Sequence, residues 1–193
     1  MRAASVNLMP DGPIGLTTEL AVLAERLGYR RCCVYDEGLA TRDVFVTLAA
    51  IAAGTAEIQL GTGITNPFVR HPGATVTAIA SIDEISGGRT FLGLGAGGGL
   101  TLDPLAIRRA RPVEAVRFMV ETTRRLLAGD VVDAIGPISS YTGARFGYGR
   151  ADIPIFMAGR GPRMTALGAE LADGFNLSYL HKDLIGETVM ALR

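Results

Sequence analysis

A glycine-rich loop after the apolar run 90–94 is the first candidate for a binding site. Gly93, Gly95 and Gly98 have the GxGxxG spacing that places a dinucleotide pyrophosphate at the start of the next helix. In dinucleotide-binding folds with this motif, an acidic residue ends a strand about 20 positions further on, and no such acid is present here. Three strand–helix units also precede the loop. We therefore interpret it as an ordinary glycine turn.

A second glycine turn follows the apolar run 153–157. It consists of small residues interrupted by two arginines: Ala158, Gly159, Arg160, Gly161, Pro162 and Arg163. Its backbone N–H groups, a helix dipole and the arginines are able to hold a phosphate. A strand-to-helix turn that needs glycine for its backbone angles explains the pattern equally well. Both interpretations stay open.

Two neighbouring acids, Asp36 and Glu37, end the apolar stretch that begins at residue 31. A charged pair in this place faces solvent, a partner or a ligand. The structural alternative is helix capping or an ion pair with Arg42, and it is the commoner outcome. Their role is therefore open at this level.

The polar residues of the next loop and the cysteines carry weaker signals. Asn66, Arg70 and His71 follow the third strand, and we favour a structural role for His71 because Pro72 follows it. The adjacent Cys32 and Cys33 form no metal-binding pattern with the histidines, so we expect no metal site and buried, reduced thiols. Hydrolase, Walker and HExxH motifs are absent, so covalent hydrolysis and phosphoryl transfer lack support.

A regular alternation of strands and helices positions these loops. We expect strands at 3–9, 31–37, 57–63, 90–94, 153–159 and 174–180, and helices at 17–27, 42–53, 73–85, 111–127 and 163–171, with a last helix beginning near the end. Thr17 is expected to cap the first helix. Leu20, Leu23, Ala24 and Leu27 would form its buried face. Residues 130–150 are irregular and Gly-rich, which indicates an excursion, a short hairpin over the barrel.

The long helix at 111–127 has an arginine-rich face. We assign Arg108, Arg109, Arg117, Arg124 and Arg125 to it. A solvated surface, or pairing with Glu114 and Glu121, explains this face better than an anion-binding patch does.

The alternation predicts one α/β domain over residues 1–193 with a parallel sheet. Six strands are visible where a closed (β/α)₈ TIM barrel has eight, so we expect an incomplete barrel of about six βα units. Parallel strands share one carboxyl end, and such sheets bind ligands at that edge. All the candidate loops above lie there.

Composition excludes several classes of partner. Lys plus Arg and Asp plus Glu number 19 each, so net charge does not favour nucleic acid or anionic lipid. The apolar runs are too short for a membrane span, and the amino end lacks the apolar core of a signal peptide. We expect a cytoplasmic protein without nucleic-acid or membrane partners.

The central block LGTGITNPFVRHPGATVTAIASIDEISGGRTFLGLGAGGG, residues 60–99, resembles the bacterial luciferase-like superfamily. It is most similar to the branch that uses the deazaflavin coenzyme F420, typified by methylenetetrahydromethanopterin reductase. The supporting pieces are YDEG, RPVEAVRFMVETTRRLLAGD and IPIFMAGRGPRMTALGAELADGFNL. The resemblance runs in order from about residue 5 to residue 177.

The resemblance implies a TIM barrel with F420 across its carboxyl-terminal mouth. A cis peptide at Gly63–Ile64, beside Thr65, would lie behind the deazaflavin ring. The other implied contacts are Asp36 and Glu37 beside the ring, Gly97 and Gly98 along the tail, and Ala158, Gly159, Arg160 and Gly161 at the phosphate. The implied reaction is hydride transfer with a small organic substrate. Glu37 is our candidate for proton transfer, because burial near an apolar ring raises a carboxyl pKa.

Departures from the family pattern leave alternatives open. Relatives that oxidise a sugar phosphate carry His at the position of Glu37 and an acid at the position of Gly98, so that substrate class is not expected. An FMN-dependent enzyme of the same fold is the nearest rival, and a non-catalytic flavin-binding homologue is the second. The missing units indicate a fragment, a shortened homologue or a chain completed by a partner. Open sheet edges favour a homo-oligomer, and we expect a dimer.

Overall fold

The computed structural model describes residues 4–177 and 181–192. Its main sheet has six strands in the order β1 (Ser5–Leu8), β2 (Arg31–Val34), β3 (Gln59–Thr62), β4 (Thr90–Leu94), β7 (Ile155–Ala158) and β8 (Gly174–Asn176). Every neighbouring pair is parallel. The sheet is therefore the partial TIM-type barrel that the sequence predicts, with β1 and β8 as its two edges. The expected ends of the first and last strands, at residue 3 and at 178–180, lie outside the described residues.

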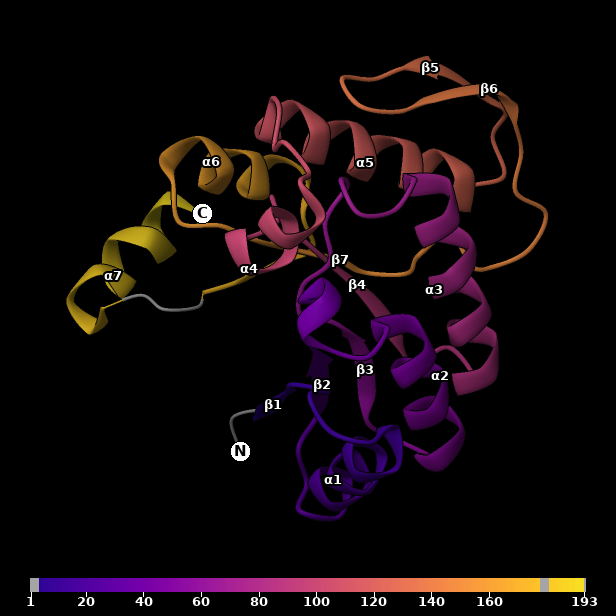
Figure 1. The fold of residues 1–193 in the computed structure, drawn as a ribbon, viewed down its shortest axis with the longest axis vertical. Helices are drawn as coiled ribbons and strands as arrows, with labels where there is room; N and C mark the ends of the chain where they lie inside the picture. Colours follow the sequence, from indigo (N-terminus) through magenta and orange to yellow (C-terminus); the bar gives the residue numbers. More distant parts are fainter. Residues whose placement is uncertain (1–3, 178–180, 193) are drawn as a thin grey trace.

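Helices follow the strands and form a curved layer on the outside of the sheet (Figure 1). They are α1 (Ile14–Arg26), α2 (Val44–Gly54), α3 (Pro72–Ser86), α5 (Pro112–Leu127), α6 (Pro162–Leu171) and α7 (Lys182–Ala191). Each packs against the next in this series. Buried aliphatic residues such as Leu48, Leu60 and Met119 fill the space between helices and sheet. Within the described ranges, no helix has the length and hydropathy needed to span a membrane.

The first helix corrects two sequence predictions. It begins at Ile14 after Pro13, so Thr17 is a buried residue of its first turns and not its cap. Its buried positions are Thr17, Ala21 and Ala24, whereas Leu20, Leu23 and Leu27 are 44%, 49% and 67% exposed. The helix packs directly on α2 and β1, and such close contact admits small side chains and leaves the leucines outside. Of the predicted apolar face, only Ala24 is correct.

Residues 130–150 contain the expected hairpin, made of β5 (Val132–Ile135) and β6 (Ser140–Ala144). Tyr141 contacts the rings of His71 and Phe118. The hairpin therefore packs on the outer side of α3 and α5 and does not cover the barrel mouth (Figure 1). His71 has the structural role that we favoured, because its Nδ1 accepts a hydrogen bond from the N–H of Gly73 at the start of α3.

Candidate functional site

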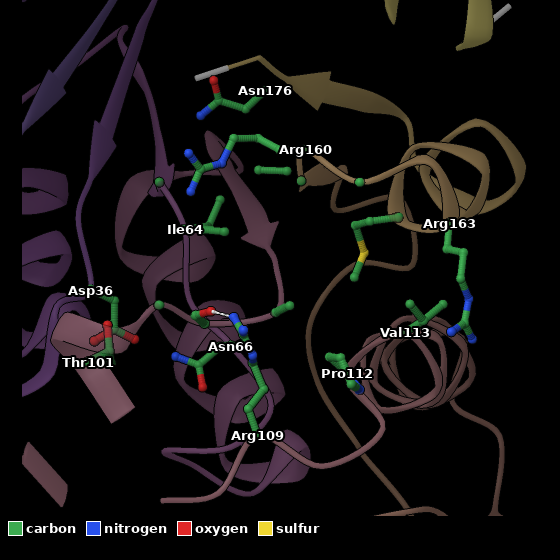
Figure 2. A pocket seen from close by; sticks show the side chains of 18 of the residues that line it. Asp36, Ile64, Asn66, Thr101, Arg109, Pro112, Val113, Arg160, Arg163 and Asn176 are labelled. Carbon is green, nitrogen blue, oxygen red and sulfur yellow. Dashed lines mark hydrogen bonds between the residues drawn. The ribbon is translucent and has the colours of Figure 1, made fainter. Parts of the chain in front are cut away.

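A cavity of 570 Å³ lies at the carboxyl ends of β2, β3, β4 and β7 (Figure 2). It brings together nearly all the residues that the sequence singled out: Asp36, Glu37, Gly63, Ile64, Gly97, Gly98, Ala158, Gly159, Arg160 and Gly161. Thr65 does not line the cavity, but its hydroxyl donates a hydrogen bond to Asp36, which does. Loops far apart in the chain thus meet at the edge where parallel α/β sheets bind ligands.

The loop after β3 forms the floor of the cavity. The Gly63–Ile64 peptide bond is cis, as the resemblance implies. The backbone N–H of Thr65 donates to the carbonyl of Gly93 at 2.9 Å, and the N–H of Gly95 donates back to the carbonyl of Thr65 at 3.0 Å. These bonds fix the loop against β4 and leave the Ile64 side chain pointing into the cavity (Figure 2).

The same packing explains two glycines of the GxGxxG pattern. A Cβ at Gly93 would lie 2.0 Å from the carbonyl oxygen of Thr62, and one at Gly95 would lie 2.0 Å from Cδ1 of Ile64. Both glycines therefore allow β4 to approach the β3 loop. Gly98 is exposed, with no heavy atom within 4 Å of its hypothetical Cβ. This agrees with the interpretation of the pattern as a turn.

The two acids of the cavity have separate partners. The hydroxyl of Thr65 donates to Oδ2 of Asp36 at 2.6 Å, and the hydroxyl of Thr101 donates to Oε2 of Glu37 at 2.8 Å. Arg42 donates instead to the carbonyl of Asp11, so the alternative of an ion pair with Arg42 is wrong. Both carboxyls are thus held by threonines, one from the loop after β3 and one from the short helix α4 (Gly99–Leu102).

Burial raises the pKa of Asp36, and the nearby Asp43 adds to this effect. The Thr65 hydroxyl, the Gly38 backbone N–H and Arg70 act in the opposite direction, because they stabilise the charged carboxylate. The net shift is upward, so burial of the Asp36 carboxyl outweighs the groups that stabilise its charge.

The loop after β4 supplies the residue that sequence reasoning missed most clearly. Arg109 precedes α5 and donates from Nη1 to the carbonyl of Gly97 at 2.7 Å (Figure 2). It lines the cavity, so its assignment to a helix face, with that of Arg108, is wrong. On α5 itself, Arg117 pairs with Glu121 and Glu170, as the pairing hypothesis expects in part. Proline is frequent at the first position of a helix, so Pro112 indicates that α5 begins there. Arg108 and Arg109 then lie in the loop before the helix.

The turn after β7 forms the opposite wall. A Cβ at Gly159 would lie 2.3 Å from Cγ of Met164, so glycine is required by close packing and not by an unusual backbone angle. Gly161 caps α6 and has open space around it. Arg160 extends from this turn toward Ile64 and Asn176 (Figure 2). Within the described ranges its guanidinium has no hydrogen bond or ion pair, whereas Arg163 lies 3.6 Å from Glu114.

The two cysteines, Cys32 and Cys33, both lie in β2. Cys32 is buried and Cys33 partly buried, and both thiols are free. Burial raises their pKa values to about 12 and about 11, which keeps them protonated and unreactive at neutral pH. In the described part of the chain, no three His, Cys, Asp or Glu side chains lie close enough together to hold a metal ion.

Comparison with known proteins gives consistent matches. Residues 3–193 match the family described as luciferase-like monooxygenase. The 5,10-methylenetetrahydromethanopterin reductase of Methanolobus tindarius is 35% identical over 176 residues, covering 91% of this chain and 54% of the relative. The enzyme of the same name from Archaeoglobus fulgidus is 38% identical, with 91% and 53% covered. The chain thus spans about half the length of these relatives.

Solved structures show the same fold. The coenzyme F420-dependent tetrahydromethanopterin reductase from Methanopyrus kandleri superposes with a TM-score of 0.83 at 29% identity, over 90% of this chain and 55% of that one. An F420-dependent secondary alcohol dehydrogenase superposes with a TM-score of 0.79 at 19% identity, covering 91% of this chain and 58% of that one. At this identity the second match supports the fold alone.

Proposed function

Because the chain belongs to the luciferase-like monooxygenase family, we propose that it binds coenzyme F420 in the cavity at the carboxyl ends of its strands. Its function would be that of an oxidoreductase acting on a small organic substrate. When bound, the coenzyme accepts or supplies the hydride, and the protein positions both partners.

The uneven distribution of charge in the cavity is the observation that carries this proposal. Ile64, Pro112 and Val113 offer an apolar surface suited to a planar ring. Arg109, Arg160 and Arg163 also line the cavity, and Arg160 has no partner among the described residues. An unpaired guanidinium at a glycine turn is suited to a phosphate. A ligand with a flat ring and an anionic tail fits this surface.

Individual residues then have defined tasks in the proposal. Ile64 and Gly63 would support one face of the ring, with Thr65 holding their loop in place, and Asp36 and Glu37 would lie beside the ring. Gly97 and Gly98 leave space for the tail, and Ala158, Gly159, Arg160 and Gly161 hold the phosphate. Glu37, held by Thr101, is our proposed residue for proton exchange with the substrate.

The number of arginines favours F420 over FMN. FMN ends in one phosphate, whereas F420 continues beyond its phosphate into an acidic tail, and the cavity offers more cations than one phosphate needs. The absence of His at position 37 and of an acid at position 98 argues against a sugar phosphate as substrate.

Fluorescence titration of the purified chain with F420, beside a matched titration with FMN, tests the proposal. We expect saturable F420 binding that weakens with added salt, because arginines hold the anionic groups. Tight FMN binding without F420 binding would overturn the choice of coenzyme. Binding of neither coenzyme would refute the proposal. Light scattering on the same samples tests the proposed homodimer.

A further inference from the structure

A second, smaller cavity lies behind the candidate site. It has a volume of 230 Å³ and is lined by Asp36, Gly38, Asp43, Val44, Phe45, Val69 and Arg70. Among the described residues, Asp36 is the one that lines both this cavity and the large one. Asp36 therefore lies at the boundary between the two cavities.

The smaller cavity is charged and reaches solvent. The side chain of Asp43 is 50% exposed and that of Arg70 is 36% exposed, and the two approach to 4.0 Å. The Arg70 guanidinium lies 4.7 Å above the Phe45 ring, which holds it in place. Its Nη1 is buried and has no hydrogen-bond partner among the described groups. A buried donor of this kind is suited to a water molecule that bridges it to a neighbouring oxygen.

We propose that Asp36 exchanges protons between the large cavity and solvent through the smaller cavity. This inference rests on the proposed function, because a coenzyme and a substrate in the large cavity would cover the front face of Asp36. Arg70 and Asp43 are positioning residues that set the charge around its carboxyl. The substrate class that needs such a route carries a hydroxyl or amine on the carbon that exchanges a hydride.

The proton balance of that reaction defines the task of Asp36. The coenzyme would take up the hydrogen of a substrate C–H bond with its electron pair, as hydride, while the O–H bond of the hydroxyl group on that carbon breaks. The electron pair of the O–H bond would form the new C=O bond, and the proton would pass by way of the neighbouring Glu37 to the Asp36 carboxylate. Water in the smaller cavity then removes the proton from Asp36. In the reductive direction each transfer is reversed.

The groups that face Asp36 from each neighbouring element have predictable effects. Asp43, the cap of α2, raises its pKa, and Arg70, in the loop after β3, lowers it. Thr65 donates to it from the same loop, and the Gly38 backbone N–H approaches it from the turn after β2. Glu37 is its neighbour in sequence and is bound to Thr101. Removing the charge of Asp43 and removing that of Arg70 should therefore shift the pKa of Asp36 in opposite directions.

The first experiment is a ¹³C NMR titration of the Asp36 carboxyl, assigned by its loss in Asp36→Asn. We expect Asp43→Asn, which keeps the helix cap, to lower the pKa of Asp36 because a nearby negative charge is removed. Arg70→Gln should raise it because a nearby positive charge is removed. The matched control Arg42→Gln removes a neighbouring charge that does not line the cavity and should leave the pKa unchanged. An Asp36 carboxyl that responds to neither variant contradicts the proposal.

The second experiment measures access from behind. In Asp36→Cys with F420 bound, the introduced thiol should still react with a small methanethiosulfonate reagent, read by peptide mass spectrometry beside wild type. Adding Val69→Phe, which fills the smaller cavity, should abolish that reaction, and Val69→Ala should not. If bound F420 alone prevents the thiol of Asp36→Cys from reacting, the proposed route through the smaller cavity is wrong. Lack of F420 binding refutes the proposed function instead, and the NMR titration on the ligand-free chain still decides whether Asp36 responds to the smaller cavity.

Discussion

The two walls of the large cavity are built differently. The wall from β2, β3 and β4 is joined by hydrogen bonds between distant loops, including those from Thr65 to Asp36 and from Thr101 to Glu37. The wall after β7 consists of an exposed turn, Gly159–Gly161, whose Arg160 has no partner in the described chain. Hydrogen bonds between distant residues stabilise the first wall, and the unpaired positive charge of Arg160 marks the second.

This difference separates stability from binding. In the first wall, buried threonines donate to half-buried carboxyl groups, so removing one partner leaves the other without its bond. The cation of the second wall is exposed, so its loss changes the fold little and removes an attraction for anions. Substitutions in the first wall should therefore change the free energy of unfolding, and those in the second should change ligand affinity.

The largest effect is expected for Gly93→Ala. The added methyl group would meet the carbonyl oxygen of Thr62 at 2.0 Å, a contact that the strand backbone must move to relieve. We expect a loss of about 3 kcal/mol or more in the free energy of unfolding, measured with urea. Gly98→Ala is the matched control, because it has open space and should unfold as wild type does. Equal stability of the two variants would contradict the described packing of β4 on the β3 loop.

Arg160→Met tests the opposite wall. It removes one charge-assisted contact, so F420 should bind about tenfold or more weakly, which corresponds to about 1.5–3 kcal/mol. The free energy of unfolding should stay unchanged. Arg108→Met, an exposed arginine outside the cavity lining, controls for general charge. If both variants weaken binding equally, the phosphate does not lie at this turn.

A third variant, Thr65→Val, breaks the contact between the β2 and β3 loops without changing side-chain size. Thr65 is fully buried and donates to Asp36. We expect a loss of about 1–2 kcal/mol in unfolding free energy and a further rise in the pKa of Asp36, because a bond to the charged carboxylate is lost. Thr77→Val, on the exposed side of α3, is the control. An unchanged carboxyl titration would show that this bond does not form in solution.

The smallest effect is the pH dependence of stability at Asp36. Its folded-state pKa is raised, so its stabilising contribution is complete below the unfolded pKa and is lost as pH rises through the folded pKa. Asp36→Asn removes this loss. The stability of the variant relative to wild type should therefore increase from about pH 4 toward pH 7. Urea unfolding at several pH values measures this slope, and a slope of the opposite sign would show that Asp36 is stabilised in its charged form.

The sequence correctly predicted the parts that depend on local pattern. Short apolar runs bounded by glycine and proline predicted the six parallel strands, and their common edge predicted where the candidate residues meet. The cis bond at Gly63–Ile64 was correctly expected from the resemblance of the central block to a known family. These features follow from the order of residues along the chain, because alternation and turns are local properties.

Other features depended on which elements become neighbours. The leucines of α1 are exposed because α2 and β1 admit only small side chains at their contact with the helix. The pKa of Asp36 is raised because the folded chain buries its carboxyl and brings Asp43 near it. Arg109 enters the site because α5 begins at Pro112 and not before it. The sequence determined the sheet and the location of its binding edge, whereas burial and charge at that edge were decided by long-range packing in the tertiary structure.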